Sequence, residues 1–191
     1  MNGTESTPAV TESAPADMRI QTRAATGITA VAVAIAVLVH FGIDPRGLIS
    51  VALAVVLVVL AGFDLDQRRI PNRIVLPAIG GILAAQIVFF PGEAFEWILA
   101  GLISGLALFL PTLFKAGAFG MGDVKLAALL GVGLGGDVLA ALFFGSLAVG
   151  AAAAWILFTR GPASRHDTIP LGPFLAFGGI VTLLAGNLPG G

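Results

Sequence analysis

Long apolar runs separated by short polar segments dominate the chain after residue 24. The runs cover residues 25–43, 47–63, 74–90, 96–114, 117–135, 138–159 and 169–188. Most are close to the roughly 20 residues that an α-helix needs to cross about 30 Å of bilayer hydrocarbon. Inside a bilayer each segment must satisfy its own backbone polar groups, so such runs form helices. The pattern therefore predicts an all-α, polytopic transmembrane bundle of about seven helices, one for each run.

The first 24 residues do not share this pattern. They are rich in Thr, Ser, Ala and Pro and carry Glu5, Glu12 and Asp17. Such a segment cannot bury enough apolar surface to fold, so residues 1–24 are expected to form a disordered tail. The first apolar run follows an acidic region instead of a basic one, which argues against a cleaved secretory signal.

The fifth run is ambiguous in length because it contains the acidic residue Asp123. About a dozen apolar residues separate Asp123 from the glycines that begin at Gly135. Either this helix is short, or it begins near Ala116 and carries Asp123 one or two turns into the bilayer, at about 5.4 Å per turn. The longer helix suits a catalytic carboxylate better, because an intramembrane carboxylate is costly unless it has a function.

Composition agrees with a membrane protein. Hydrophobic residues make up 57% of the chain and charged residues 11%, against roughly 25% charged in soluble domains. The length of 191 residues leaves room for one bundle and a short tail, but not for a second domain of ordinary size. The chain has no cysteine, which excludes disulfides, thiolate nucleophiles and cysteine-based zinc sites.

The positive charges predict an orientation, because Lys and Arg are concentrated in short cytoplasmic loops. With a cytoplasmic amino terminus, nine of the ten basic residues lie inside and Arg46 alone lies outside. The inside set is Arg19, Arg23, Arg68, Arg69, Arg73, Lys115, Lys125, Arg160 and Arg165. The same orientation brings Asp64 and Asp123 to the cytoplasmic face from separate helices. The two carboxylates can therefore be neighbours.

Two carboxylates in a confined site share one proton, because both cannot ionise easily. Such a pair supports general acid/base hydrolysis: the anionic group draws a proton from water while the neutral group polarises the scissile carbonyl. Gly120 and Gly122 flank this chemistry and leave space for a substrate strand beside Asp123. Lys125 either biases the titration of the pair or extends toward lipid headgroups.

Structural interpretations of the same residues remain open on spacing alone. Asp123 can act as an N-cap of the following helix, where the helix dipole favours a negative charge. Asp64 and Asp66, beside Arg68 and Arg69, can form a salt-bridged interfacial loop. Neither interpretation requires catalysis.

Three motifs carry a resemblance to a known family. The stretch 117–126 contains a G-x-G-D sequence that closely resembles the signature of type IV prepilin peptidases, which are membrane aspartic proteases. Asp64, followed seven residues later by Pro71 and then by Asn72, resembles the first catalytic motif of that family. The stretch 169–178 is similar to its carboxy-terminal I-P-x-G-P-x-L-A segment. Three motifs in family order are more specific than G-x-G-D alone.

The resemblance covers approximately residues 47–188 and implies that Asp64 and Asp123 form a catalytic dyad. Asp64 is preferred to Asp66 because its seven-residue step to Pro71 matches the family pattern. Residues expected to support the site are Gly120, Gly122, Lys125, Pro71, Asn72, Pro170, Gly172 and Pro173. The two prolines and the glycine of the third motif are expected to shape a helix entrance, because proline lacks a backbone donor and restricts its predecessor.

The implied protein is a membrane aspartic endopeptidase that cleaves the leader of prepilin-like precursors at the cytoplasmic face of the bacterial cytoplasmic membrane. Its domains would be the tail over 1–24, an extra amino-terminal transmembrane helix and loop over 25–46, and a six-helix peptidase-like domain over 47–191. Its partners would be the precursor and membrane lipid, with no nucleic acid, metal or other cofactor. Long bifunctional relatives carry a cysteine-containing cytoplasmic loop associated with methylation, whereas this chain resembles the short peptidase-only form of Tad-type pilus systems. The resemblance therefore gives no support for S-adenosylmethionine binding.

Two rival functions belong to other classes. A small ion-coupled transporter would use intramembrane aspartates at broken helices, but both acidic clusters fall at one face and no inverted halves are evident. A non-catalytic partner of a pilus apparatus would not need the aspartates. Presenilin-like G-x-G-D proteases are disfavoured because they use a Tyr-Asp pair and this chain has no tyrosine.

Overall fold

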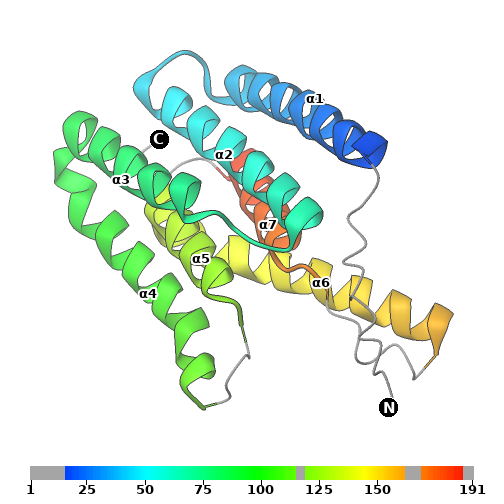
Figure 1. Ribbon diagram of the computed structural model, residues 1–191. Helices are drawn as coiled ribbons and strands as arrows, with labels where there is room; N and C mark the ends of the chain where they lie inside the picture. The colour runs from blue at the N-terminus through cyan, green and yellow to red at the C-terminus, as the bar shows by residue number, and fades with distance from the viewer. Residues whose placement is uncertain (1–15, 115–118, 162–168, 187–191) are drawn as a thin grey trace, which may run out of the picture.

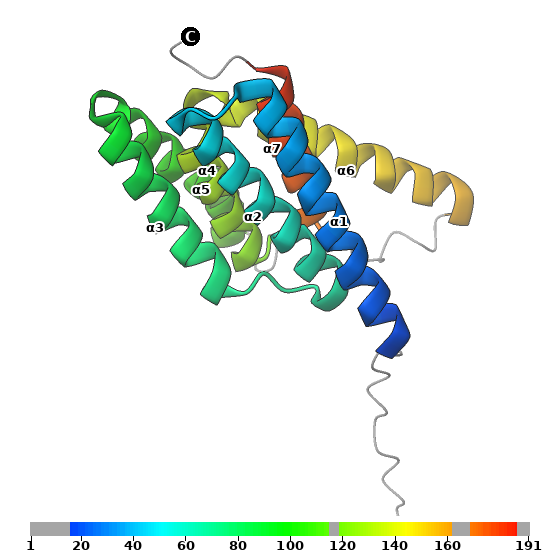
Figure 2. The same ribbon diagram turned by 90° about the horizontal axis from the view of Figure 1, so that it is seen from above.

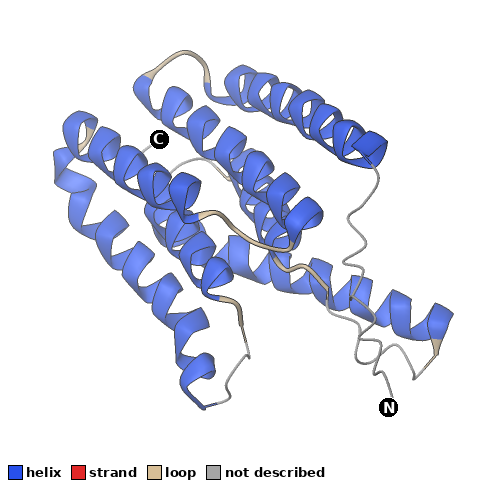
Figure 3. Ribbon diagram, viewed as in Figure 1, coloured by secondary structure: helices blue, strands red, loops and turns tan. Residues whose placement is uncertain are grey.

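The structure is a computed structural model that describes residues 16–114, 119–161 and 169–186. Regular structure in these residues is helical throughout, without a β-strand (Figure 3). The helices are α1 (Ala16–Phe41), α2 (Pro45–Gln67), α3 (Asn72–Phe89), α4 (Ala94–Phe114), α5 (Met121–Leu134), α6 (Val138–Arg160) and α7 (Gly172–Ala185). Short 3₁₀ turns, η1 (Pro91–Glu93) and η2 (Gly135–Asp137), precede α4 and α6. The predicted all-α bundle is confirmed.

Five helical stretches of the described residues are long and apolar enough to cross a membrane. They are Gln21–Phe41, Pro45–Gln67, Asn72–Phe89, Pro91–Phe114 and Met121–Arg160, the last of which joins α5, η2 and α6. Helix α7 is apolar but shorter. Large apolar side chains such as Val39, Phe95 and Phe158 remain exposed on the outside of the bundle, as expected where a surface faces lipid. The chain is therefore an integral membrane protein.

Helix α5 lies at the centre of the bundle and packs mainly against α4 and α3, with further contacts to α7, α6 and α2 (Figures 1 and 2). Leu126, Leu129 and Leu130 are completely buried there. With 14 residues, α5 is about 21 Å long at 1.5 Å per residue. The fifth helix is thus the short alternative and begins at Met121 instead of near Ala116. Gly120 ends the preceding segment in an extended conformation, which stops the helix from starting earlier.

Small residues hold α5 tightly against α4. A Cβ atom at Gly131 would collide with the Ser104 hydroxyl and the backbone carbonyl of Ala100. The buried Ser104 hydroxyl also donates a hydrogen bond of 2.8 Å to the carbonyl oxygen of Ala127. In a membrane the hydrophobic effect does not drive helices together. Small residues that allow close backbone approach are therefore a common means of packing them. This packing fixes the position of α5, whose first turn carries Asp123.

The amino-terminal helix begins earlier than the sequence predicted. Helix α1 starts at Ala16, so residues 16–24, which were expected to be part of a disordered tail, are helical. Residues 1–15 lie outside the described residues. Residue 16 is the first that the structure assigns to the helix. Polar composition in the following turn hid the helix start, because helix formation does not require apolar residues at every turn.

Charges at the far end of the bundle explain the one basic residue that departs from the predicted orientation. Arg46, at the start of α2, pairs with Glu93 at 2.8 Å. Its guanidinium group also lies 4.5 Å from the centre of the Phe90 ring, within the range of a cation–π contact. The charge of Arg46 is thereby compensated locally, at the end opposite Asp64 and Asp123.

Candidate active site

The three sequence motifs meet at one end of the bundle. The connection from α2 to α3 carries the first motif, the start of α5 carries the second, and the start of α7 carries the third. The Gly172 backbone amide donates a hydrogen bond to Asp64, and Ile70 packs against Gly122. Residues that lie far apart in the chain are therefore in direct contact.

Asp64 lies in the last turn of α2, with 6% of its surface exposed. Its Oδ2 atom accepts a hydrogen bond of 2.9 Å from the backbone N–H of Gly172, the first residue of α7. The first N–H groups of a helix lack partners within it and carry a partial positive charge. Asp64 therefore lies near the end of one helix and accepts a hydrogen bond from the first N–H group of another.

Gly172 must be glycine for Asp64 to approach α7 in this way. A Cβ atom at position 172 would lie 2.7 Å from Asp64 Oδ2 and 3.0 Å from its Cγ. Pro173 is the second residue of α7, a position in the first turn where a missing N–H costs no helical hydrogen bond. Pro170 precedes α7 by two residues. The third motif thus forms the beginning of the helix that contacts Asp64.

Asp123 occupies the third position of α5, and Gly120 is the N-cap residue. The Asp123 carboxylate accepts a hydrogen bond of 3.3 Å from the backbone N–H of Gly120. Asp123 is therefore not itself the N-cap, although it does satisfy a backbone donor at the helix start. In a capping box, a Glu side chain at the same helix position accepts this hydrogen bond from the N-cap residue. The other carboxylate oxygen of Asp123 remains for further interactions.

The two carboxyl groups are electrostatic neighbours. The charge of Asp64 acts on Asp123 across the space between α2 and α5, and the guanidinium group of Arg68 acts on Asp64. Both carboxyl groups are partly removed from water by the surrounding helices. A pair of this kind favours one anionic and one protonated member.

Ile70 is a contact residue that the sequence did not predict. A Cβ atom at Gly122 would lie 3.0 Å from the Cβ of Ile70 and 3.3 Å from its Cγ1. An apolar side chain of the first motif therefore packs against Gly122, and the expected place for a substrate strand beside Asp123 stays a prediction. The available signal was an isolated apolar residue between Arg69 and Pro71 in an otherwise polar turn.

Lys125 joins the second motif to the first. Its ammonium group donates a hydrogen bond of 2.7 Å to the side-chain oxygen of Asn72, the first residue of α3. Pro71 is the N-cap of α3, and its carbonyl oxygen accepts hydrogen bonds from Ile74 at 3.0 Å and Val75 at 3.2 Å. Lys125 therefore fixes α5 to the start of α3.

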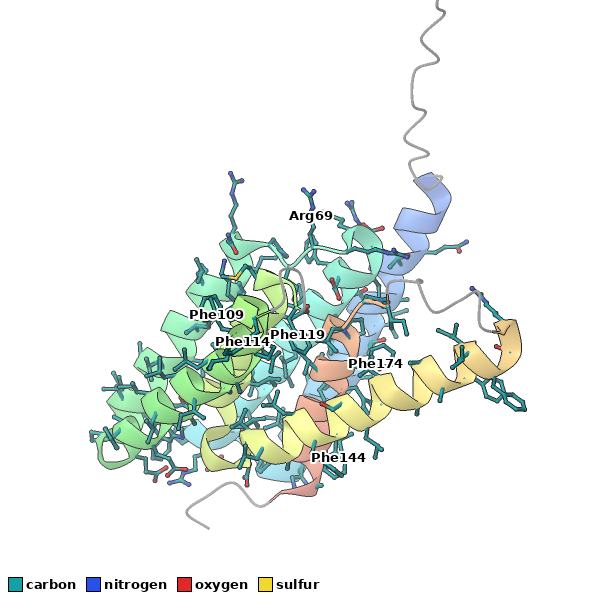
Figure 4. All side chains as sticks on the ribbon, turned by 90° about the horizontal axis from the view of Figure 1, so that it is seen from below. Arg69, Phe109, Phe114, Phe119, Phe144 and Phe174 are labelled. Carbon is teal, nitrogen blue, oxygen red and sulfur yellow. The ribbon has the colours of Figure 1, made fainter. Side chains whose placement is uncertain are left out.

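The connection between α2 and α3 makes a tight turn. Arg68 adopts a left-handed conformation with φ 49°, and its backbone N–H donates a hydrogen bond of 2.8 Å to the carbonyl oxygen of Asp64. Arg69 projects from this turn away from the bundle (Figure 4). Because α2 continues to Gln67, Asp64 and Asp66 belong to a helix. The alternative of an interfacial loop around them is therefore wrong.

Asp66 faces a different part of the protein from Asp64. It lines a small cavity between α1 and α2, together with Arg23, Thr26 and Gly62. Residues two apart on a helix are separated by about 200° around its axis, at 3.6 residues per turn. The helix geometry thus separates the two acidic side chains. Across the described parts of the chain, no group of three or more His, Cys, Asp or Glu residues gathers into a candidate metal site.

Residues 51–156 match the sequence model of the type IV leader peptidase family. Several bacterial proteins named prepilin leader peptidase/N-methyltransferase are similar to the chain. The Bacillus subtilis (strain 168) protein is 30% identical over 149 residues, covering 78% of this chain and 60% of the relative. The Aeromonas hydrophila protein is 34% identical over 145 residues, covering 73% and 50%. The Stutzerimonas stutzeri protein is 34% identical over 155 residues, covering 78% and 53%.

The chain thus spans between 50% and 60% of the length of these relatives. No solved structure matches it. Asp64 and Asp123 both fall inside the region that matches the family, whereas Gly172 lies beyond it.

Proposed function

Because the chain belongs to the type IV leader peptidase family, we propose that it is a membrane aspartic endopeptidase that cleaves leader peptides from prepilin-like precursors. One observation carries the proposal. Asp64 and Asp123 come from separate helices inside the family-matched region, yet the turn that follows Asp64 packs against the start of α5 through the contact of Ile70 with Gly122. The relatives are named prepilin leader peptidase/N-methyltransferase, and these names supply the class of substrate. The proposal concerns the peptidase reaction only.

The pair would hydrolyse a peptide bond with one proton shared between the two carboxyl groups. The anionic carboxylate accepts a proton from water, and the resulting hydroxide attacks the scissile carbonyl carbon. The protonated carboxyl group donates a hydrogen bond to the carbonyl oxygen and stabilises the negative charge that develops there. Transfer of a proton to the leaving nitrogen then completes cleavage, and the pair returns to its starting protonation state.

The substrate would approach from the side of the membrane where the Asp pair lies. Arg68, Arg69, Arg73 and Lys125 belong to the same end of the bundle, as does the amino-terminal part of α1 (Figure 2). Positively charged residues of this kind concentrate on the cytoplasmic side. We therefore propose a cytoplasmic site, with the precursor's apolar helix in the bilayer and its leader outside the hydrocarbon.

The test is cleavage of a prepilin-like precursor by the full chain in co-expressing cells, followed by mass spectrometry of the precursor. Asp64→Asn and Asp123→Asn keep the shape of each side chain and remove its acid/base function. Each is expected to lower the cleavage rate by about 10²- to 10⁴-fold, the usual contribution of a general acid or base. Asp66→Asn is the matched control, because Asp66 lies on the same helix and faces α1.

The expected control result is cleavage at the rate of the unchanged protein. Cleavage that persists in either Asp64→Asn or Asp123→Asn would contradict the dyad. Equal loss in all three variants, with less protein in the membrane, would mean that the substitutions act through folding. The amount of each variant in the membrane is therefore measured alongside cleavage.

A further inference from the structure

The contact between α7 and Asp64 distinguishes the two carboxyl groups. We infer that the backbone amide of Gly172 holds Asp64 in its anionic form, so that Asp64 accepts the proton from water and Asp123 keeps the shared proton. Gly172 is then a positioning residue that acts through Asp64. This inference rests on the proposed peptidase function and divides the roles within that site.

The amide of Gly172 is directed at Asp64 because of the way α7 begins. Pro173 has no N–H, and the N–H of Phe174 donates to the carbonyl oxygen of Leu171 at 3.1 Å. The first turn of α7 therefore presents the N–H of Gly172 to Asp64, at 2.9 Å. A hydrogen bond to a charged acceptor is stronger than one between neutral groups. The positive end of the α7 dipole adds to it.

The charges around Asp64 act in the same direction. Arg68, at the end of α2, acts electrostatically on Asp64. Helix α7 carries no charged side chain between Gly172 and Ala185, so its contribution comes from the backbone. Helix α5 contributes Asp123, whose negative charge would oppose that of Asp64. One of the two must hold a proton.

Asp123 is the less supported anion. Its hydrogen bond to the Gly120 amide is 3.3 Å long and closes a turn of its own helix. The nearby cation in the sequence, Lys125, donates to Asn72 instead. Asp64 is the charged group that acts on Asp123. Both carboxyl groups lie beside the start of a helix, α7 for Asp64 and α5 for Asp123, so the helix dipoles do not separate them. The shorter hydrogen bond and the arginine are both on the side of Asp64, which places the shared proton on Asp123.

An amide-to-ester exchange at residue 172 tests the inference directly. Incorporating glycolic acid in place of Gly172 replaces the N–H by an ester oxygen, adds no side chain and leaves the backbone shape almost unchanged. The readout is the pH dependence of kcat/KM for precursor cleavage in detergent or liposomes. Its acid limb reports loss of the catalytic anion, and its alkaline limb reports loss of the proton from the acid.

The ester should move the acid limb upward by roughly one pH unit, because a lost charge-assisted hydrogen bond makes protonation of Asp64 easier. At a fixed pH on that limb, the expected loss is about tenfold. The alkaline limb should stay in place. An unchanged profile, or a shift of the alkaline limb alone, would overturn the inference.

Gly172→Ala is a genetically simpler companion. It keeps the N–H but introduces a methyl group 2.7 Å from Asp64 Oδ2, so kcat should fall across the whole pH range. The matched control is Gly179→Ala on the same helix, whose methyl group would meet the flexible tips of Leu130 and Leu57. That variant should keep the pH profile of the unchanged protein even if α7 packs less well. A profile shift in Gly179→Ala equal to that of the ester would also overturn the inference.

The dyad variants separate this inference from the proposed function. If Asp64→Asn still cleaves the precursor, the peptidase mechanism itself fails. If Asp64→Asn is inactive and the ester leaves both limbs unchanged, the mechanism stands and the role of Gly172 does not.

Discussion

Adding one methyl group at Gly122 should disturb the site without touching either carboxylate. In Gly122→Ala, the new Cβ atom would lie 3.0 Å from the Cβ of Ile70, whereas carbon atoms in ordinary contact are about 3.5–4.0 Å apart. The two segments must therefore separate by about 0.5–1 Å. Ile70 cannot swing away by changing its rotamer, because its Cβ is attached to the backbone.

The expected loss follows from that displacement. A misplacement of about 1 Å can lower the rate of an enzyme by roughly 10²-fold, so Gly122→Ala should lower kcat/KM for cleavage by about 10- to 100-fold. The accompanying cost to stability should be about 1–3 kcal/mol, which is usual for an overpacked site. Gly80→Ala on α3 is the matched control, because a Cβ atom there has no neighbour within 4 Å.

A second substitution distinguishes displacement of the helix from lost space for the substrate. Ile70→Gly removes the three atoms that would contact the new methyl group, which lie at 3.0, 3.3 and 3.4 Å. The double variant Gly122→Ala/Ile70→Gly should therefore cleave faster than Gly122→Ala alone. If the double variant shows no recovery, the methyl group acts on the substrate and the packing argument is refuted. Full activity in Gly122→Ala alone would refute both.

Three further substitutions test the support of the site and of the bundle. Lys125→Met removes the 2.7 Å hydrogen bond to Asn72. It should lower the free energy of unfolding by less than about 1 kcal/mol, because the two side chains lie near the surface. In the same precursor assay, the cleavage rate should fall only a few-fold. Arg46→Gln removes the ion pair with Glu93 at the opposite end of the bundle. It should lower the unfolding temperature in detergent by a few degrees and leave the cleavage rate unchanged. A large loss of cleavage would contradict the placement of the site. Gly131→Ala forces a methyl group against the backbone of α4; it should destabilise the protein by at least about 1–3 kcal/mol, and unchanged membrane levels and melting would count against this close packing.

Much of the helical architecture could be predicted from the sequence. In a bilayer, apolar runs and backbone hydrogen bonding leave few alternatives to helices, so the run over 138–159 became α6 with almost the same bounds, Val138–Arg160. Predictions failed where the ends of helices depend on local backbone chemistry. Helix α1 began at Ala16 within a polar segment, and α2 continued through Asp64 and Asp66.

The length of α5 depended on tertiary packing. A helix of 14 residues is too short to span the hydrocarbon of a bilayer alone. The apolar run therefore favoured the prediction of a longer helix. In the structure α5 is enclosed by other helices, with Leu126 and Leu129 fully buried. Its middle and its carboxy-terminal end are therefore surrounded by protein, whereas Met121 at its start is exposed. A helix enclosed in this way has no need to match the thickness of the membrane.

The sequence by itself determined the class of protein and the family, and it predicted the two carboxylates of the proposed dyad, because hydropathy and motif spacing are properties of the chain. Their roles remained undivided, since spacing says nothing about which donors reach each oxygen. The tertiary structure brought the amide of Gly172 to Asp64 at 2.9 Å and placed Ile70 against Gly122. Both contacts join segments from different helices. They exist because packing around α5 draws the ends of α2, α5 and α7 together, and this convergence gives the two carboxyl groups different surroundings.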